Sequence, residues 1–141
     1  MSRTTRIGRA FTLVEVLIVV IVLGILAAIV VPQFSTASED ANLSALKTNL
    51  QTIRAQLELY KLQHNGTYPA LNTFTTQMTE GTKVDGTAGT DLGPYLLTIP
   101  NNPFSNVNTI TNEAAGSGKG WYYDATTGEF RANDSVAHRA L

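Results

Sequence analysis

The sequence predicts an α+β protein in which a long N-terminal helix, one half membrane-spanning and the other amphipathic, packs on a small C-terminal antiparallel β-sheet. Two observations predict the helix. Residues 16–31 carry no charged or polar side chain, and apolar residues then recur every three or four positions. A third observation predicts the sheet, because two short aromatic runs flank a turn that contains Gly128.

Four segments are expected along the chain, each with its own composition. They are a basic segment at 1–10, an apolar helix of membrane-spanning length at 11–32, an amphipathic helix at 33–65 and a small loop-rich β domain at 66–141. The two helical segments together span about 80 Å, which is far longer than a domain of this size needs. The excess length favours packing against other subunits.

The first segment is basic, and the second is apolar. Three arginines and no acidic residue precede Phe11: Arg3, Arg6 and Arg9. From Phe11 to Val31 the chain covers about 32 Å as a helix, enough to cross a bilayer. Because basic ends stay on the cytoplasmic side, we expect a single-pass helix with the C-terminal domain outside the cytoplasm. An ordinary secretory signal fits less well, because the apolar run is too long and the helical pattern continues beyond it.

Glu15 is a carboxylate near the start of the apolar run. In lipid such a group costs on the order of a few kcal/mol unless water at the interface solvates it. Two explanations stay open. Glu15 lies about 6 Å along the helix from Phe11, so headgroup water could reach it. Alternatively it pairs, in an assembly, with the free amine that cleavage before Phe11 would create on a neighbouring subunit.

The N-terminal pattern resembles that of a known family. Residues 9–15 read Arg-Ala-Phe-Thr-Leu-Val-Glu, and the apolar run that follows contains Gly24 and ends at Pro32. This arrangement is similar to the class III signal of type IV pilins, which the pseudopilins of type II secretion systems share.

The resemblance implies how the N-terminus is processed. A prepilin peptidase would cut between Ala10 and Phe11 and methylate the new amine of Phe11. Residues 1–10 would then be a leader peptide, and the helix at 11–32 would be transmembrane before assembly and form the filament core after it. The resemblance also implies that Glu15 acts in docking and register within a filament. The sequence departs from the family pattern at Ala10, where glycine is usual.

The amphipathic half of the helix shows one apolar stripe. Its members are spaced 3, 4, 3, 4 and 3 residues apart: Leu43, Leu46, Leu50, Ile53, Leu57 and Tyr60. We expect this stripe to pack on the sheet, with a coiled-coil seam as the alternative. Pro32, with Gly24 as a second weak point, should kink or locally melt the helix, which in a filament would let its N-terminal half bend into the bundle. The helix is expected to end at residues 64–66, with Gly66 in the left-handed cap position.

The C-terminal segment contains short elements between turns and loops. We predict a short helix at 71–78, a strand at 96–99, a flexible loop at 111–120 and a hairpin of 121–123 with 129–131. Three aromatic side chains of the hairpin should cover the helix stripe: Trp121, Tyr123 and Phe130. Carbohydrate or other ligand binding through these aromatics is the alternative.

This segment also resembles the family, with less specific motifs. Residues 60–69 are similar to the helix exit of major pseudopilins, and residues 97–104 to their Leu-Pro-x-Asp-Pro-Trp segment, with Asn102 and Phe104 at the Asp and Trp positions. Major pseudopilins hold a calcium ion in a loop of this domain, but no equivalent set of acids is evident. Oxygen ligands are available in principle from three acidic residues: Asp124, Glu129 and Asp134. We expect no cofactor and leave calcium open.

Composition and charge exclude several function classes. The 141 residues carry a net charge of −1, and without the leader seven basic residues face eleven acidic ones. Nucleic acid is therefore not expected as a main partner. The chain has no cysteine for disulfides or thiolate-bound metal. Its two histidines, His64 and His138, form no triad spacing with Ser and Asp, so no enzyme is predicted.

The resemblance therefore implies a structural subunit of a type II secretion pseudopilus. It implies a helical homo-oligomer that works with prepilin peptidase, an inner-membrane assembly platform and minor pseudopilins. The location implied is the bacterial inner membrane, with the C-terminal domain in the periplasm and a filament after assembly. Two alternatives stay open: a type IV pilin of a surface fibre for adhesion, motility or DNA uptake, and a membrane-anchored binding domain that never polymerises.

Overall fold

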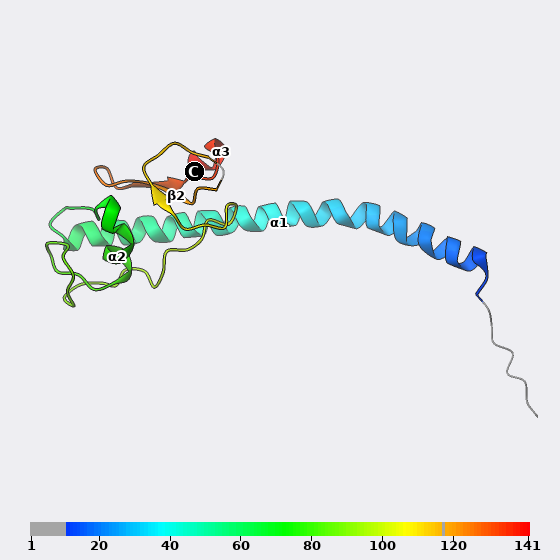
Figure 1. Cartoon of the computed structure of the whole chain (residues 1–141), viewed down its shortest axis with the longest axis horizontal. Coiled ribbons are helices and arrows are strands. Elements are labelled where there is room, and N and C mark those ends of the chain that lie inside the picture. The colour runs from blue at the N-terminus through cyan, green and yellow to red at the C-terminus, as the bar shows by residue number, and fades with distance from the viewer. Residues whose placement is uncertain (1–10, 117) are drawn as a thin grey trace, which may run out of the picture. The chain divides into compact units, whose positions relative to one another are not determined.

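The computed structural model describes residues 11–116 and 118–141, without the side chains of 31–35, so the predicted leader lies outside the described residues. The elements follow in this order: α1 (Leu13–Gln63), η1 (Leu71–Thr73), α2 (Phe74–Thr79), β1 (Ile110–Thr111), β2 (Trp121–Asp124), β3 (Glu129–Ala132) and α3 (Val136–Arg139) (Figure 1). The chain divides into two compact units between Asp40 and Ala41. The predicted α+β class with a long N-terminal helix is confirmed.

Helix α1 is continuous over 51 residues, about 77 Å. The helix continues through both Gly24 and Pro32, so it does not melt locally at either position, and a kink at Pro32 stays a prediction. A proline removes one N–H group from the hydrogen-bond ladder and its ring crowds the preceding turn, and a helix accommodates both effects by bending.

The end of α1 is a left-handed cap that starts one residue earlier than predicted. Asn65 has a φ of 54° and Gly66 a φ of 83°. The Gly66 N–H donates to the Lys61 carbonyl at 2.9 Å, which satisfies a carbonyl of the last helical turn. Asparagine is one of the few residues other than glycine that enters this conformation at low cost. Gly66 is left-handed, as predicted, and Asn65 before it is left-handed as well.

The sheet has the order β1-β2-β3 and is mixed. Strands β2 and β3 form the predicted hairpin, with Trp121 opposite Ala132 and Tyr123 opposite Phe130. Strand β1 pairs with β2 in parallel, Ile110 opposite Trp121, so the prediction of a purely antiparallel sheet is wrong. After β1 the chain forms a loop, and β2 then lies alongside β1 in the same direction. No turn motif in the sequence predicts a parallel pairing of this kind.

The predicted strand at 96–99 is also wrong. The backbone N–H groups of Tyr95 and Leu96 both donate to one carbonyl, that of Met78, at 3.0 and 2.8 Å. Leu97 points away from the domain with 94% of its surface exposed. Prolines flank the segment at 94 and 100, and because proline has no N–H group it cannot contribute a ladder hydrogen bond. The predicted short helix at 71–78 corresponds to η1 and α2.

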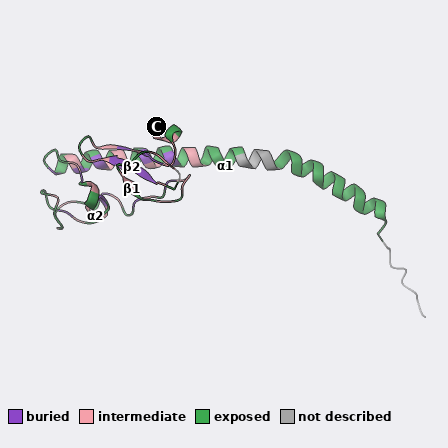
Figure 2. Cartoon of the chain, turned by 45° about the horizontal axis from the view of Figure 1, so that its top comes forward, coloured by how far each residue is buried: buried purple, intermediate pink, exposed green. Residues whose placement is uncertain are grey.

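The core of the C-terminal unit lies between the amphipathic half of α1 and the sheet. The helix stripe is buried from Leu46 to Tyr60, and Leu43 at its start is half-buried. Trp121, Tyr123 and Phe130 join the stripe in one cluster, with Phe74 and Met78 of α2. In Figure 2 the buried residues of α1 lie in this half of the helix, and residues 13–30 are exposed. The predicted aromatic cover over the helix stripe is confirmed.

Candidate assembly interface

The N-terminal unit presents an uncovered apolar helix. Residues Leu13–Val30 have a mean hydropathy of 3.2, and none of them is buried within the chain. The segment is long and apolar enough to cross a membrane. Exposed apolar surface of this extent on a water-soluble protein is unusual and indicates contact with lipid or with other protein chains.

The first turn of α1 is closed by a reciprocal pair of polar residues. The backbone N–H of Thr12 donates to Glu15 Oε2 at 2.9 Å, and the Glu15 N–H lies 3.3 Å from Thr12 Oγ1. The Thr12 hydroxyl also donates to Glu15 Oε2 at 2.9 Å. This is a capping box, in which Thr12 is the N-cap and Glu15 the third helical residue. The cap gives Glu15 a local partner that neither explanation from the sequence included.

The other predicted site residues are placed as follows. Ala10 lies outside the described residues. Phe11 precedes the helix in an irregular segment and is 85% exposed. A Cβ added to Gly24 would meet nothing within 4 Å, so the helix surface there is open. Pro32 lies within the helix, beyond the exposed apolar span. The structure therefore brings Thr12 and Glu15 together and leaves Gly24 and Pro32 apart from them along α1.

Thr12 is the site residue that the sequence analysis missed. The signal was available, because a Thr followed three residues later by Glu at the start of an apolar run is the signature of a capping box. The sequence analysis considered Glu15 as a charged group and not as part of a helix cap.

The acidic residues considered for calcium each have other partners. Asp124 Oδ1 accepts from the Thr126 N–H at 2.8 Å, and Glu129 pairs with Arg131. Asp134 Oδ1 accepts from Asn102 Nδ2 at 2.7 Å. Within the described residues, no three His, Cys, Asp or Glu side chains are grouped to hold a metal ion.

Both histidines have structural contacts. His64 is buried, with Nδ1 at 2.8 Å from the Tyr60 carbonyl and Nε2 at 3.0 Å from Thr82 Oγ1. His138 Nδ1 pairs with Asp134 Oδ2. In the described part of the chain, neither imidazole ring is hydrogen-bonded to a serine hydroxyl as the base of a nucleophilic triad would be. Ser135 Oγ accepts from the backbone N–H of His138 at 3.1 Å.

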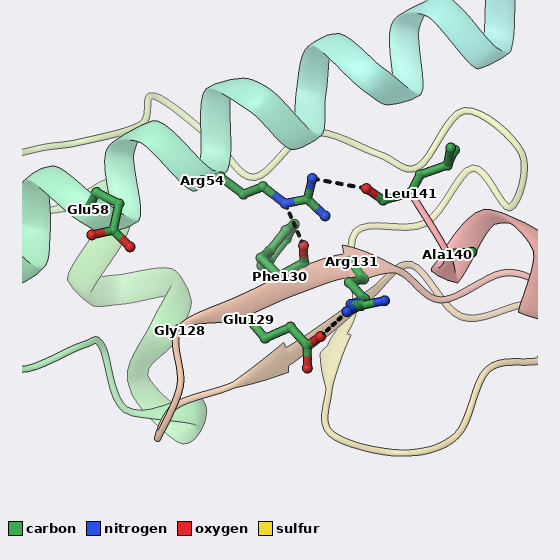
Figure 3. Close-up of a pocket in the computed structure, with 8 residues that line it drawn as sticks. All are labelled: Arg54, Glu58, Gly128, Glu129, Phe130, Arg131, Ala140 and Leu141. Carbon is green, nitrogen blue, oxygen red and sulfur yellow. Dashed lines mark hydrogen bonds and ion pairs between the residues drawn. The ribbon is translucent and has the colours of Figure 1, made fainter.

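A cavity of about 320 Å³ lies between α1 and β3, lined by Arg54, Glu58, Phe130 and Arg131 among others (Figure 3). Arg54 Nε donates to the Phe130 carbonyl at 2.9 Å, and a terminal nitrogen donates to the Leu141 carbonyl at 3.1 Å. Partial burial, and then the charge of Arg131, lowers the pKa of Arg54. The arginine therefore ties α1 to β3 and to the segment after α3, which is a structural role.

An exposed apolar helix of membrane-spanning length that continues into the core of a small α+β domain defines a pilin-like subunit. Two family models match the chain: the prokaryotic N-terminal methylation motif at residues 6–31, and type II secretion system protein G at residues 33–123. The chain belongs to the type II secretion system protein G family, the major pseudopilins.

Curated relatives named "type II secretion system core protein G" agree with this assignment. The protein of Pseudomonas aeruginosa is 45% identical over 60 residues, which are 43% of this chain and 42% of that protein. The Escherichia coli (strain K12) protein is 25% identical over 140 residues, 99% of this chain and 96% of that protein. The Aeromonas hydrophila protein is 32% identical over 101 residues, 68% of this chain and 67% of that protein. No solved structure matches the chain.

Proposed function

We propose that the protein is a structural subunit of a type II secretion pseudopilus that polymerises through α1 to drive protein secretion. One observation supports this most directly: Leu13–Val30 is exposed along its whole length and apolar at every position except Glu15. Such a surface needs lipid around it in the isolated subunit and other helices around it in a filament. Because the chain belongs to the major pseudopilins, the helices around α1 in a filament would be those of further copies of the same chain.

Processing is the first step of the proposal. Prepilin peptidase would cut between Ala10 and Phe11, and Phe11 would carry the N-methyl group. Phe11 lies in an irregular, exposed segment before α1, where a protease can bind an extended backbone. The match to the N-terminal methylation motif covers this junction.

Glu15 is proposed to act in the assembly in addition to capping its own helix. Thr12 occupies Oε2 of the carboxylate through two hydrogen bonds, which leaves Oε1 for a partner. The amine of a neighbouring Phe11 would supply a charge-assisted hydrogen bond, stronger than a neutral one in an apolar surrounding. Gly24 offers an open patch of backbone for close helix packing. Pro32 is proposed to let the helix bend where subunits pack.

The proposed location is the bacterial inner membrane, with a single span and the C-terminal domain in the periplasm. The apolar helix fits an anchor of this kind. The proposed partners are the inner-membrane assembly platform and minor pseudopilins, together with copies of the chain itself. No catalytic role is proposed, because the family is a structural one.

The alternatives differ in what the N-terminal segment does. A type IV pilin of a surface fibre would use the same processing and packing in a longer polymer. A membrane anchor that does not polymerise would keep Leu13–Val30 in lipid and would need Glu15 only as a cap. The second alternative now has a specific observation in its favour, the capping box itself.

Three substitutions separate the charge of Glu15 from its capping role. Glu15→Gln keeps an acceptor that can complete a capping box but removes the charge. Thr12→Ala keeps the charge and removes the N-cap side chain, at a cost of about 0.5–2 kcal/mol of helix stability. Glu15→Ala removes both. We expect Glu15→Gln and Glu15→Ala to lose filaments while Thr12→Ala retains most of them, with membrane insertion unchanged in all three.

The measurements are sheared or pelleted filaments, membrane fractionation and the mass of the mature N-terminus. A methylated Phe11 at the N-terminus of the unsubstituted protein supports the processing step, and an intact leader would overturn it. Normal filaments from Glu15→Gln would exclude a role for the charge. Equal loss in Thr12→Ala and Glu15→Gln would make the cap, and not a neighbouring amine, the function of this residue.

A further inference from the structure

A second cavity, of about 310 Å³, lies beside the C-terminal end of α1. It is lined in part by Tyr60, Tyr68, Ala70, Val84, Asp85 and Gly86. The last three belong to a tight turn, in which the Gly86 N–H donates to the Lys83 carbonyl at 2.8 Å. The cavity lies in the C-terminal unit and shares no residue with the assembly interface.

The hydroxyl of Tyr60 lies at the wall of this cavity. The ring is 1% exposed, stacks on His64 with centroids 3.6 Å apart, and meets the edge of Tyr95 at 5.2 Å. A Cβ added to Gly86 would lie 3.0 Å from the Tyr60 hydroxyl oxygen, which places that oxygen against the turn. No hydrogen-bond partner of this hydroxyl is found among residues 11–116 and 118–141.

The other buried tyrosines in the described part of the chain do have partners. The Tyr95 hydroxyl donates to Gln63 Oε1 and the Tyr123 hydroxyl to the Pro69 carbonyl, both at 2.7 Å. Among the described residues, Ser105 Oγ is the side-chain atom that is fully buried without a hydrogen-bond partner, so the Tyr60 hydroxyl oxygen keeps contact with solvent at the cavity. It can therefore bind a group that enters the cavity.

Asp85 supplies a negative charge to the same cavity. Its Oδ1 accepts from the Thr87 hydroxyl at 2.6 Å and from the Thr87 N–H at 3.0 Å, so Oδ2 can still accept from a ligand. These hydrogen bonds, and then the charge of Lys83, lower the pKa of Asp85, which keeps it ionised at neutral pH. Burial, and then the neighbouring Tyr95 and Asp85, raises the pKa of Tyr60, which keeps the phenol protonated.

The remaining cavity wall restricts the kind of ligand further. Gln77 is already occupied, since Oε1 accepts from the Ala70 N–H and Nε2 donates to the Gly86 carbonyl, both at 2.9 Å. Ala70 and the half-exposed Val84 provide apolar surface. Asp85 Oδ2 is thus the charged group that the wall offers to a ligand. The Tyr60 hydroxyl and the exposed side chains of Asn65 and Thr67 are its neutral polar groups, beside two aliphatic side chains.

The Tyr68 ring at the cavity wall offers no free face on which a sugar ring could stack. One face of the Tyr68 ring is under Lys61, whose Nζ lies 4.5 Å from the ring centroid. A Cβ added to Gly128 would overlap the Tyr68 ring, so the hairpin turn also packs against this side chain. An anionic ligand would be repelled by Asp85. The chemistry that remains is a cation with N–H donors on an aliphatic stem.

We propose that this cavity binds a primary ammonium group on an alkyl chain, either a free amine or the side chain of a lysine. The ammonium donates to Asp85 Oδ2 and to the Tyr60 hydroxyl oxygen, and the alkyl chain packs on Ala70 and Val84. Lys83 lies near Asp85 and offsets part of the attraction, so the binding is weak. This site is independent of the assembly of α1.

The test is a titration of the full chain in detergent micelles, followed by the backbone amide spectrum of ¹⁵N-labelled protein. The probes are n-butylammonium chloride, Nα-acetyl-lysine methylamide and, as the uncharged match, 1-butanol, all at constant ionic strength. We expect saturable shifts of the Asp85 and Gly86 amides with an amine and no comparable shifts with 1-butanol. Saturation by both amines identifies the ammonium group as sufficient. Saturation by the lysine derivative alone identifies a protein side chain as the source.

Two variants test the two contacts. Asp85→Asn should weaken amine binding about two- to fivefold, the range of an exposed ion pair. Tyr60→Phe should weaken it about two- to tenfold, the range of one hydrogen bond, while the domain stays folded because that hydroxyl has no protein partner. Asp91→Asn and Tyr122→Phe make the same chemical changes away from the cavity and should leave binding unchanged. The proposal is overturned if no shift saturates, if 1-butanol gives the same shifts, or if both cavity variants bind the amine as the unsubstituted protein does.

Discussion

Gly128→Ala tests the contact between the hairpin turn and Tyr68. Gly128 has a φ of 76°, and a Cβ there would overlap the Tyr68 ring. The left-handed backbone costs an alanine about 1–2 kcal/mol. Displacing the ring adds about 1–3 kcal/mol, typical of overpacking. The ring cannot move freely, because its hydroxyl donates to Glu58 Oε1 at 2.6 Å and accepts from Lys61 Nζ at 3.2 Å. Together these two terms cost about 2–5 kcal/mol, before the effect of the alanine on the unfolded chain.

Gly66→Ala is the matched control for the backbone term. Gly66 has a φ of 83°, and a Cβ there would meet nothing within 4 Å. Both alanines restrict the unfolded chain equally, which offsets about 0.4–1 kcal/mol in each variant and cancels in the comparison. We expect Gly66→Ala to lose only about 1 kcal/mol, so the difference between the variants measures the clash with Tyr68.

Denaturant unfolding in detergent micelles would measure both losses. Trp121 is the only tryptophan in the chain and is 0% exposed, so its fluorescence reports directly on the core of the C-terminal unit. Equal destabilisation by the two alanines would refute the reasoning, because the ring contact would then contribute nothing. Unchanged stability in Gly128→Ala would refute the backbone term as well.

Two further substitutions test the buried polar groups. Asn102→Ala should cost about 2–4 kcal/mol in the same unfolding experiment, because it leaves Asp134 Oδ1 and the Phe104 N–H without the partner that Asn102 supplies, whereas the exposed Asn101→Ala should stay within about 0.5 kcal/mol. Burial raises the pKa of Tyr123 far above its usual value. The unfolded chain therefore ionises this tyrosine first, so the stability it contributes is complete below about pH 10 and is lost as pH rises further. Tyr123→Phe should flatten that alkaline decline; an unchanged slope between pH 10 and 12 would contradict the assignment.

The elements that the sequence predicted are those with a local signal. The spacing of Leu46, Leu50 and Ile53 follows the helical period, and the helix buries those side chains. The alternation of Trp121 and Tyr123 about a turn ending in glycine predicts both the hairpin and its buried face. In each case residues close in sequence decide the outcome.

The elements that the sequence missed depend on distant partners. Ile110 pairs with Trp121 because the chain forms a loop after β1 and β2 then runs parallel to β1. The composition of this segment does not predict such a pairing. Residues 96–99 have the composition of a strand, but the available acceptor is a single carbonyl at Met78 rather than a neighbouring strand. The cavity beside Tyr60 also depends on residues that are distant in sequence. The spacing of the apolar stripe does not indicate that the Tyr60 hydroxyl lies at a cavity wall.

The candidate site was predicted in position and only partly in chemistry. The order of the leader, Phe11, Glu15 and the apolar run follows from the sequence, and the family matches agree with it. The roles of Ala10, Phe11, Gly24 and Pro32 in processing and assembly stay predictions. The role of Glu15 in assembly also stays a prediction, and the structure adds a second role, because the same carboxylate satisfies the start of its own helix.

The burial of the α1 stripe has a mechanical consequence. The C-terminal domain is covalently joined to the helix at the chain after Gln63, but rows of side chains from Leu46 to Tyr60 also join them, and Arg54 adds a hydrogen bond to the Phe130 carbonyl. A force applied along the helix axis would load these contacts together, in shear, instead of peeling the domain away one contact at a time. Subunits built in this way transmit a push through the whole length of the stripe, so the connecting chain need not bear the load.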